Sequence, residues 1–151
     1  MKLKRRKRAA STRPRRKRYP KSDSDASRAP DDRWTCYLIE QASTPRVPRT
    51  PQAYIGVTLN LARRLAQHGG RLVGGARRTS AASAAGATWR LVATVRGFRS
   101  KHDILSFEWV AHRRMRRRTQ RPTAAEESVA VLRELAAWPK WGGGLRLELE
   151  A

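Results

Sequence analysis

The chain is short of cysteine and of long apolar runs, and each shortage excludes a class of protein. The single cysteine, Cys36, excludes an internal disulfide and any zinc cluster built from several cysteines. No apolar run approaches the roughly 18 residues of a membrane span, and no signal peptide opens the chain. We therefore expect an intracellular protein with no membrane-spanning segment.

Acidic residues are also scarce relative to basic ones. The chain has 34 Lys and Arg against 12 Asp and Glu, which gives a formal net charge of +22. The excess is not confined to one end, because residues 34–121 alone carry 17 basic and 3 acidic side chains. Positive charge on a segment that folds indicates a polyanionic partner, most simply nucleic acid. An anionic membrane surface is the competing partner.

Residues 1–33 are rich in Lys, Arg, Ser, Asp and Pro and have almost no apolar side chains. Such a segment buries too little surface to fold, so we predict a disordered basic tail followed by one folded domain at 34–151. Basic clusters at 2–8 and 13–18 are typical of nuclear import signals or nucleic-acid-binding arms. Import would place the protein in the nucleus. The alternative is a solvated tail that only adds nonspecific affinity.

Alternating apolar residues predict strands at 34–41, 53–57 and 89–98. The first two should pair antiparallel across a proline-rich loop at 42–51. Alternating leucines at 145–149 predict a short terminal strand or extended segment.

Helices are predicted between and after these strands. The first follows the second strand and ends at the pair Gly69-Gly70, the second begins at a Ser100/Asp103 capping box, and the third begins at Thr123 and runs to about Ala137. Residues 69–88, rich in Gly, Ala, Ser and Arg, should form a flexible basic loop. The fold class is α+β, with a small central antiparallel sheet of about three strands flanked by helices.

Two helical positions have spacings that favour chemistry. At about 100° per residue, Arg64 and His68 fall together beside an apolar stripe, with Arg63 on the opposite side, and could form a phosphate pocket. The alternative is an ordinary basic surface helix. Glu108 shares a predicted buried face with Leu105, Trp109 and His112. A buried carboxylate needs a cation, so Glu108 should hold a metal or form a structural ion pair with an arginine.

These residues and several motifs resemble a known family. Tyr37, the Tyr54-Ile55-Gly56 triplet, Arg64, His68 and Glu108 follow the order of the GIY-YIG nuclease superfamily. Further motifs are similar to the catalytic subunit of SLX1-type structure-specific endonucleases: QHGG at 67–70, GGARRT at 74–79, Trp89, GF at 97–98 and FEW at 107–109. The likeness covers about residues 34–149.

The resemblance implies a metal-dependent endonuclease that cuts branched DNA, such as flaps, forks and Holliday-type junctions, in repair or recombination. It implies that Glu108 holds one divalent ion, Mg²⁺ or Mn²⁺, without zinc, and that Arg64 grips the scissile phosphate. Tyr37 and Tyr54 would orient the attacking water, and one of them would act as general base with His68 near enough to accept the proton. The pKa of that tyrosine would have to fall, and Arg64 and the metal are the charges able to lower it.

Other basic or polar residues would bind the DNA backbone. These are Arg63, Arg71, Arg77, Arg78, Thr79, Arg113, Arg114, Arg116, Arg117 and Arg118. A catalytically inactive, basic DNA-binding or architectural protein is the alternative function, because the same charge would serve it equally well.

The sequence departs from the family in three respects, one of which is the long, proline-rich loop between the two tyrosines. The first motif reads Thr35-Cys36-Tyr37 and keeps only the tyrosine. The family continues into a zinc-binding RING-like module, which one cysteine cannot form. That module binds the scaffold partner, so dependence on an SLX4-like scaffold is in doubt, and a homodimer of the free protein is another assembly to consider. A streamlined or virus-encoded relative is an alternative origin.

Overall fold

The computed structural model describes residues 32–42, 52–118 and 125–150. The predictions of a disordered tail, of the proline-rich loop and of a cap at Thr123 fall largely outside these ranges. The elements in chain order are β1 (Thr35–Ala42), β2 (Ala53–Thr58), α1 (Leu61–His68), α2 (Arg77–Ala84), β3 (Thr88–Arg96), α3 (Lys101–Arg118), α4 (Ala125–Ala136), the 3-10 turn η1 (Pro139–Trp141) and β4 (Arg146–Leu149).

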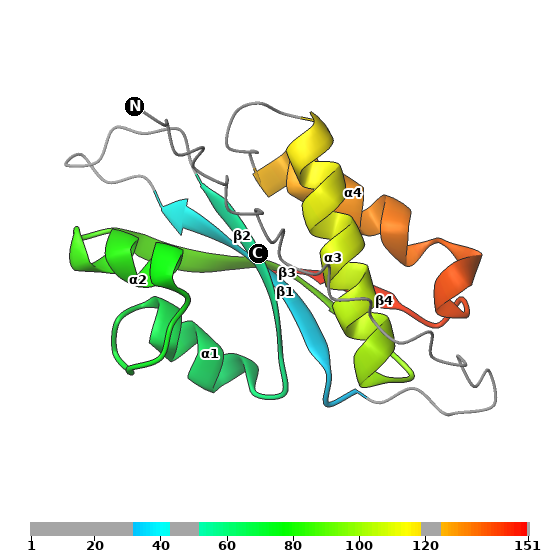
Figure 1. Cartoon of the computed structure of the whole chain (residues 1–151), viewed down its shortest axis with the longest axis horizontal. Coiled ribbons are helices and arrows are strands. Elements are labelled where there is room, and N and C mark those ends of the chain that lie inside the picture. Colours follow the sequence, from blue (N-terminus) through cyan, green and yellow to red (C-terminus); the bar gives the residue numbers. More distant parts are fainter. Residues whose placement is uncertain (1–31, 43–51, 119–124, 151) are drawn as a thin grey trace, which may run out of the picture.

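The strands form one antiparallel sheet in the order β2-β1-β3-β4 (Figure 1). The predicted pairing of the first two strands is confirmed, with Tyr37 opposite Gly56. The terminal leucines form a true strand, since Leu147 pairs with Val95 on β3. The sheet therefore has one strand more than the three expected, within the predicted α+β class.

The helices lie on two sides of the sheet, with α1 and α2 on one side and α3 and α4 on the other (Figure 1). The alternation of β1 matches this arrangement, because successive side chains of a strand point to opposite faces. Cys36 and Leu38 join the core cluster with residues of α3 and α4, whereas Tyr37 faces α1. Alternate residues of β1 thus enter the main core on one face of the sheet and contact α1 on the other.

The main core is closed by aromatic contacts. Phe107 packs edge-on against Phe98 and Trp141, with ring centroids 5.2 and 5.5 Å apart. Such edge-to-face pairs are favourable beyond the apolar area that they bury. The expectation that Trp141 helps to close the core is confirmed, since it is buried.

The predicted buried face of α3 is wrong in phase. The residues that enter the core are Ile104, Phe107, Ala111 and Met115, whereas Trp109 is 51% exposed. The i, i+3, i+4, i+7 spacing fits both faces, and the sheet packs against the one with fewer polar groups. Glu108 lies at the border of this face and is partly buried.

The predicted flexible loop at 69–88 contains a helix, α2, which is a second correction. Its sequence, RRTSAASA, lacks the alternation of a core helix but is rich in alanine, the best helix former. Contacts with α1 hold it in place, including a hydrogen bond of 2.5 Å from Ser83 Oγ to the His68 carbonyl. None of the helices in the described part of the chain is long and apolar enough to cross a membrane.

Candidate active site

The hydroxyl of Tyr37 lies at the centre of a buried polar group on the α1 side of the sheet. It is 2.7 Å from His68 Nε2 and accepts a hydrogen bond of 3.1 Å from Arg64 Nε. Tyr37 and His68 are both fully buried, and the Tyr54 ring lies 5.1 Å from the imidazole between centroids. The structure therefore brings together four of the five residues that the sequence indicated as catalytic.

Arg64 is held so that its guanidinium points toward this group. It also donates to Gln67 Oε1 at 3.1 Å and to the Gly74 carbonyl at 3.3 Å. Asn60 caps the helix that carries it, accepting from the Arg63 backbone N–H at 2.9 Å. The cap and the Gly74 contact were missed from the sequence, although an asparagine directly before an apolar helix is a recognisable cap.

An open depression begins beside the same guanidinium. Arg63, Arg64 and Gln67 line it from α1, and residues at the end of β2 and Trp34 complete it. Arg63 is exposed, whereas Arg64 is half-buried. The predicted difference in exposure between the two neighbouring arginines is therefore present, but both side chains line the same depression.

Gly56 leaves the space in which the two tyrosines approach each other. A Cβ atom at this position would lie 2.5 Å from Tyr37 Oη and 3.0 Å from Tyr54 Cε1. A Cβ contact of 2.5 Å essentially never occurs in folded proteins, so a larger residue would displace the hydroxyl from His68. The glycine of the Tyr54-Ile55-Gly56 triplet is therefore a steric requirement of the site.

Thr79 orients the imidazole from the far side. Its hydroxyl lies 2.7 Å from His68 Nδ1 and donates to the Ala76 carbonyl at 3.0 Å. A hydroxyl has one proton, so Thr79 Oγ1 must accept from Nδ1–H. His68 Nε2 is then the acceptor, and it takes the hydrogen bond of the Tyr37 hydroxyl. The prediction that Thr79 binds DNA is wrong, since its side chain is fully buried behind the site.

A pattern that describes the GIY-YIG catalytic domain matches residues 33–121 of this sequence. The match spans more than half of the chain and includes every residue of the group described above. The chain belongs to the GIY-YIG family.

The chain is also similar to curated proteins named structure-specific endonuclease subunit slx1 or SLX1. It is 43% identical over 76 residues to the one from Aspergillus clavatus, covering 50% of this chain and 16% of that protein. It is 42% identical over 79 residues to the Leishmania infantum homologue, covering 52% and 10%, and 31% identical over 140 residues to the one from Aspergillus terreus, covering 83% and 34%. The chain thus spans between 10% and 34% of the length of these relatives.

The fifth residue of the GIY-YIG motif set, Glu108, approaches from α3 on the other side of the edge strand β2. Burial raises the pKa of its carboxyl, and the positive charge of Arg64 partly offsets that rise. His112 Nε2 lies 3.9 Å from Glu108 Oε1, and burial lowers the pKa of this histidine. The partner that the described residues give Glu108 is thus a histidine that burial keeps neutral, rather than the arginine of the ion-pair alternative.

Glu108 could hold a divalent ion only if most of the other ligands of that ion came from water or substrate. The described residues contain no group of three or more His, Cys, Asp or Glu side chains that could enclose a metal. A single partly buried carboxylate suits Mg²⁺, which keeps several waters and is often completed by phosphate oxygens. The donor set therefore fits an ion shared between Glu108, water and a phosphate.

The pKa values of the buried pair differ from what the sequence suggested. Burial raises the pKa of Tyr37 well above its usual range, and the hydrogen bond from Arg64 offsets only part of this effect. Burial and then the charge of Arg64 lower the pKa of His68 to about 4. Both shifts favour the neutral form at pH 7, and the positive charge of Arg64 does not by itself lower the pKa of Tyr37 as the role of general base would require.

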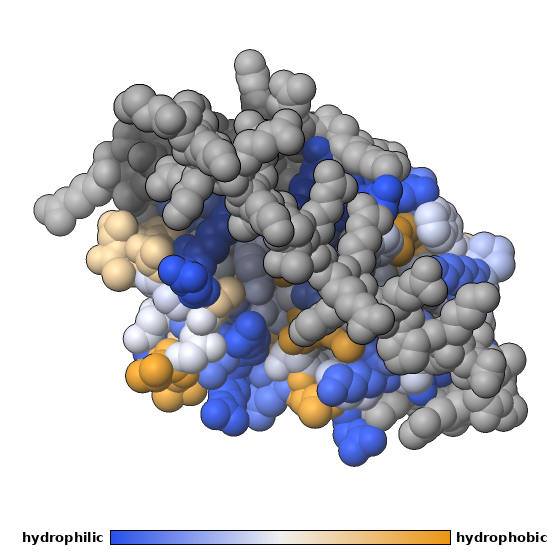
Figure 2. Space-filling model, in the orientation of Figure 1, coloured by the Kyte–Doolittle hydropathy of each residue, from blue (hydrophilic) through white to orange (hydrophobic). Residues whose placement is uncertain are grey.

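The remaining arginines divide between the surface and structural contacts. Figure 2 shows hydrophilic residues across much of the described surface on one face. Arg63, Arg71, Arg77, Arg78, Arg113 and Arg116 are exposed. Arg114 instead stacks over Trp138 at 4.3 Å and pairs with Glu134, so its guanidinium makes structural contacts between α3 and the α4 region. The side chains of Arg117 and Arg118 lie outside the described part.

The orientation of His68 can be tested directly by nuclear magnetic resonance. We expect a neutral imidazole with the proton on Nδ1 that titrates only near pH 4. Because the unfolded state takes up this proton first, near the usual pKa of about 6.5, the free energy of unfolding should fall as the pH drops from about 6.5 to 4.

Thr79→Ser should preserve the Nδ1–H tautomer, and Thr79→Val, which removes the acceptor, should allow the Nε2–H form to appear. Imidazole nitrogen shifts distinguish the two forms. An Nε2–H tautomer in the unmodified protein would contradict the assignment.

Gly56→Ala should destabilise the fold by about 1–3 kcal/mol, as overpacking does in closely packed sites. Gly69→Ala is the matched control, because a Cβ there would meet its nearest neighbour at 3.5 Å. Urea unfolding of both variants measures the difference, and equal midpoints would show that Tyr37 can move aside freely.

Proposed function

We propose that the protein is a metal-dependent endonuclease that hydrolyses phosphodiester bonds in branched DNA during repair or recombination. The observation that carries this proposal is the hydrogen-bonded group of Arg64, Tyr37 and His68, with Glu108 close enough for its pKa to respond to Arg64. Membership of the GIY-YIG family supports nuclease chemistry, and the names of the relatives support a structure-specific substrate.

The side chains match the requirements of phosphodiester hydrolysis. Arg64 presents a guanidinium at the mouth of the open depression, where its fork can bind two oxygens of the scissile phosphate. A divalent ion, Mg²⁺ or Mn²⁺, held by Glu108 would neutralise charge on that phosphate and lower the pKa of nearby hydroxyls.

Proton transfer falls to the buried pair. Tyr37 is the better placed of the two tyrosines to act as base toward the attacking water, because its own proton already points at His68 Nε2. Burial disfavours the charged form of both groups, so transfer of that proton to His68 would need added positive charge nearer the Tyr37 oxygen than the imidazole, and a divalent ion held by Glu108 would supply it. Tyr54, against the imidazole, would help to position the water.

Partners and location are further proposals. The relatives are named as subunits, which favours an assembly with another protein, an SLX4-like scaffold or a second copy. The basic clusters at 2–8 and 13–18 favour import into the nucleus. A catalytically inactive DNA-binding protein is the competing function, because the net charge supports both.

Cleavage of branched DNA with Mg²⁺ or Mn²⁺ is the decisive measurement. We expect Glu108→Gln to abolish cutting while DNA binding and folding are retained, because the change removes a metal ligand at nearly constant volume. Glu127→Gln, at an exposed position on α4, is the matched control and should cut normally. A purified protein that binds junctions but cuts none with either metal, alone or with a partner subunit, would favour the inactive alternative.

The two neighbouring arginines provide a second comparison. Arg64→Ala should lower the rate of cutting by about 10²–10³-fold or more, as expected when a group that stabilises the transition state is lost. Arg63→Ala should reduce DNA affinity with a much smaller effect on the rate at saturating DNA. Single-turnover kinetics separates the two effects, and equal losses of rate would contradict the role given to Arg64.

A further inference from the structure

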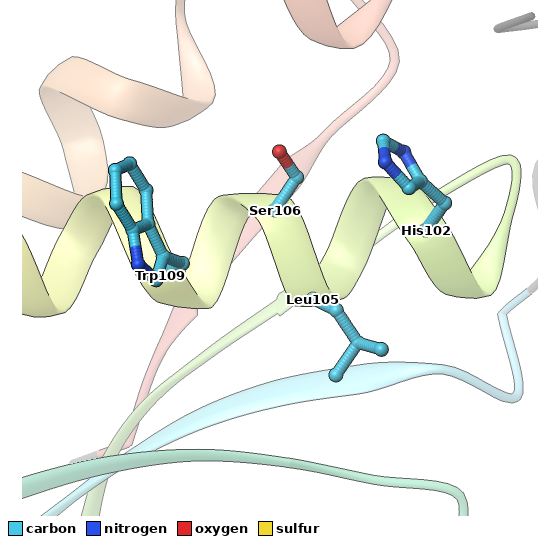
Figure 3. A pocket seen from close by; sticks show the side chains of 4 residues that line it. All are labelled: His102, Leu105, Ser106 and Trp109. Atoms are coloured by element: carbon cyan, nitrogen blue, oxygen red, sulfur yellow. The ribbon is translucent and has the colours of Figure 1, made fainter. Parts of the chain in front are cut away.

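Trp109 is a large aromatic residue left exposed on the helix that carries Glu108. Its side chain is 51% exposed, whereas the core face of α3 lies elsewhere on the helix. It lines a pocket of about 190 Å³ with His102, Leu105 and Ser106. Figure 3 shows Trp109, Ser106 and His102 pointing away from the sheet and Leu105 pointing back toward it.

The surroundings of the indole ring are positively charged. The Arg113 guanidinium lies 5.2 Å from the ring centroid of Trp109, and at 100° per residue Arg116 falls within about 20° of it around the helix. The two acidic residues of α3, Asp103 and Glu108, fall 100° or more away. The outer face of α3 therefore combines an exposed aromatic surface with cationic side chains.

This combination fits one kind of nucleotide. Aromatic side chains stack on bases without regard to sequence, and arginines bind the accompanying phosphates. In a continuous duplex the faces of the bases are covered by their neighbours, so a base can stack on the indole where it is unpaired, as in a single-stranded flap.

We propose that Trp109 is a stacking platform for an unpaired base of branched DNA, with Arg113 and Arg116 binding its phosphates. The proposal deepens the proposed function, on which it rests, by naming a residue that recognises the branch. Trp109 directly follows Glu108, and consecutive Cα atoms are about 3.8 Å apart. Their side chains leave the helix about 100° apart, so the unpaired base would be bound on the face of α3 next to the one that carries the carboxylate.

The test measures binding without cleavage, so that it does not depend on catalysis. A flap substrate carries 2-aminopurine at the unpaired position nearest the branch, and the full-length protein is titrated in EDTA. We expect the fluorescence of the analogue to be quenched by stacking. Trp109→Ala should remove the quenching and weaken binding to the flap by about 5- to 150-fold, with little change for linear duplex.

Two further variants separate stacking from general effects. Trp109→Phe should restore most of the quenching, and Val73→Ala, at a 98% exposed apolar position, should behave as the unmodified protein. Equal weakening for flap and duplex, or unchanged flap binding by Trp109→Ala, would overturn the proposal. The proposal would also be overturned if sedimentation showed that Trp109→Ala changes the oligomeric state of the protein, because the surface around Trp109 would then be an interface between copies. A protein that stacks the base but never cuts would overturn the proposed function alone.

Discussion

The hydrogen bond between the Tyr37 hydroxyl and His68 Nε2 is the interaction on which the site depends. It joins the central strand of the sheet to the last residue of α1, and both partners are fully buried. A buried polar pair is tolerated only when its hydrogen bonds are satisfied, and here Arg64 and Thr79 satisfy the rest. The backbone of β2 is also adapted to this hydrogen bond, because Gly56 has no Cβ atom that would clash with the Tyr37 hydroxyl.

Burial shifts the pKa values of Tyr37 and His68 in opposite directions. It raises the pKa of Tyr37 and lowers that of His68, so the pair resists ionisation until another charge arrives. The same environment raises the pKa of Glu108. In the proposed mechanism, a divalent ion and a phosphate would change the local field and so allow the pair to ionise. The net charge of the rest of the chain would serve a different purpose in the proposed nuclease, because long-range attraction raises the rate at which DNA is encountered.

The helices on the two sides of the sheet supply different groups to the candidate site. Helices α1 and α2 supply the arginine and the oriented histidine, while α3 supplies the carboxylate and the exposed Trp109. The edge strand β2 lies between these groups, which allows Glu108 to act electrostatically on Tyr37 and Arg64. An edge strand leaves room for such an approach, whereas a central strand is covered by its neighbours on both sides.

Much of this protein follows from local sequence. Alternation gave the strands correctly, and the 3.6-residue period distinguished Arg64 from Arg63 because the two point in different directions from one helix. The order of the motif residues indicated the GIY-YIG family and four side chains that lie together in the structure, those of Tyr37, Tyr54, Arg64 and His68. Strand alternation, helical period and motif order are all properties of residue order along the chain, so they can be identified from the sequence.

Only the tertiary structure decided the features that depend on contacts between elements distant in sequence. The apolar spacing of α3 fits two faces, and the sheet selected the one with Phe107, which left Trp109 in solvent. Residues 77–84 have little apolar pattern, so their helix is apparent only from its contacts with α1. Thr79 was expected on the DNA and lies behind His68 instead. A hydrogen bond between residues distant in sequence depends on where the backbone brings two polar atoms together, and the sequence carries no periodic record of that position.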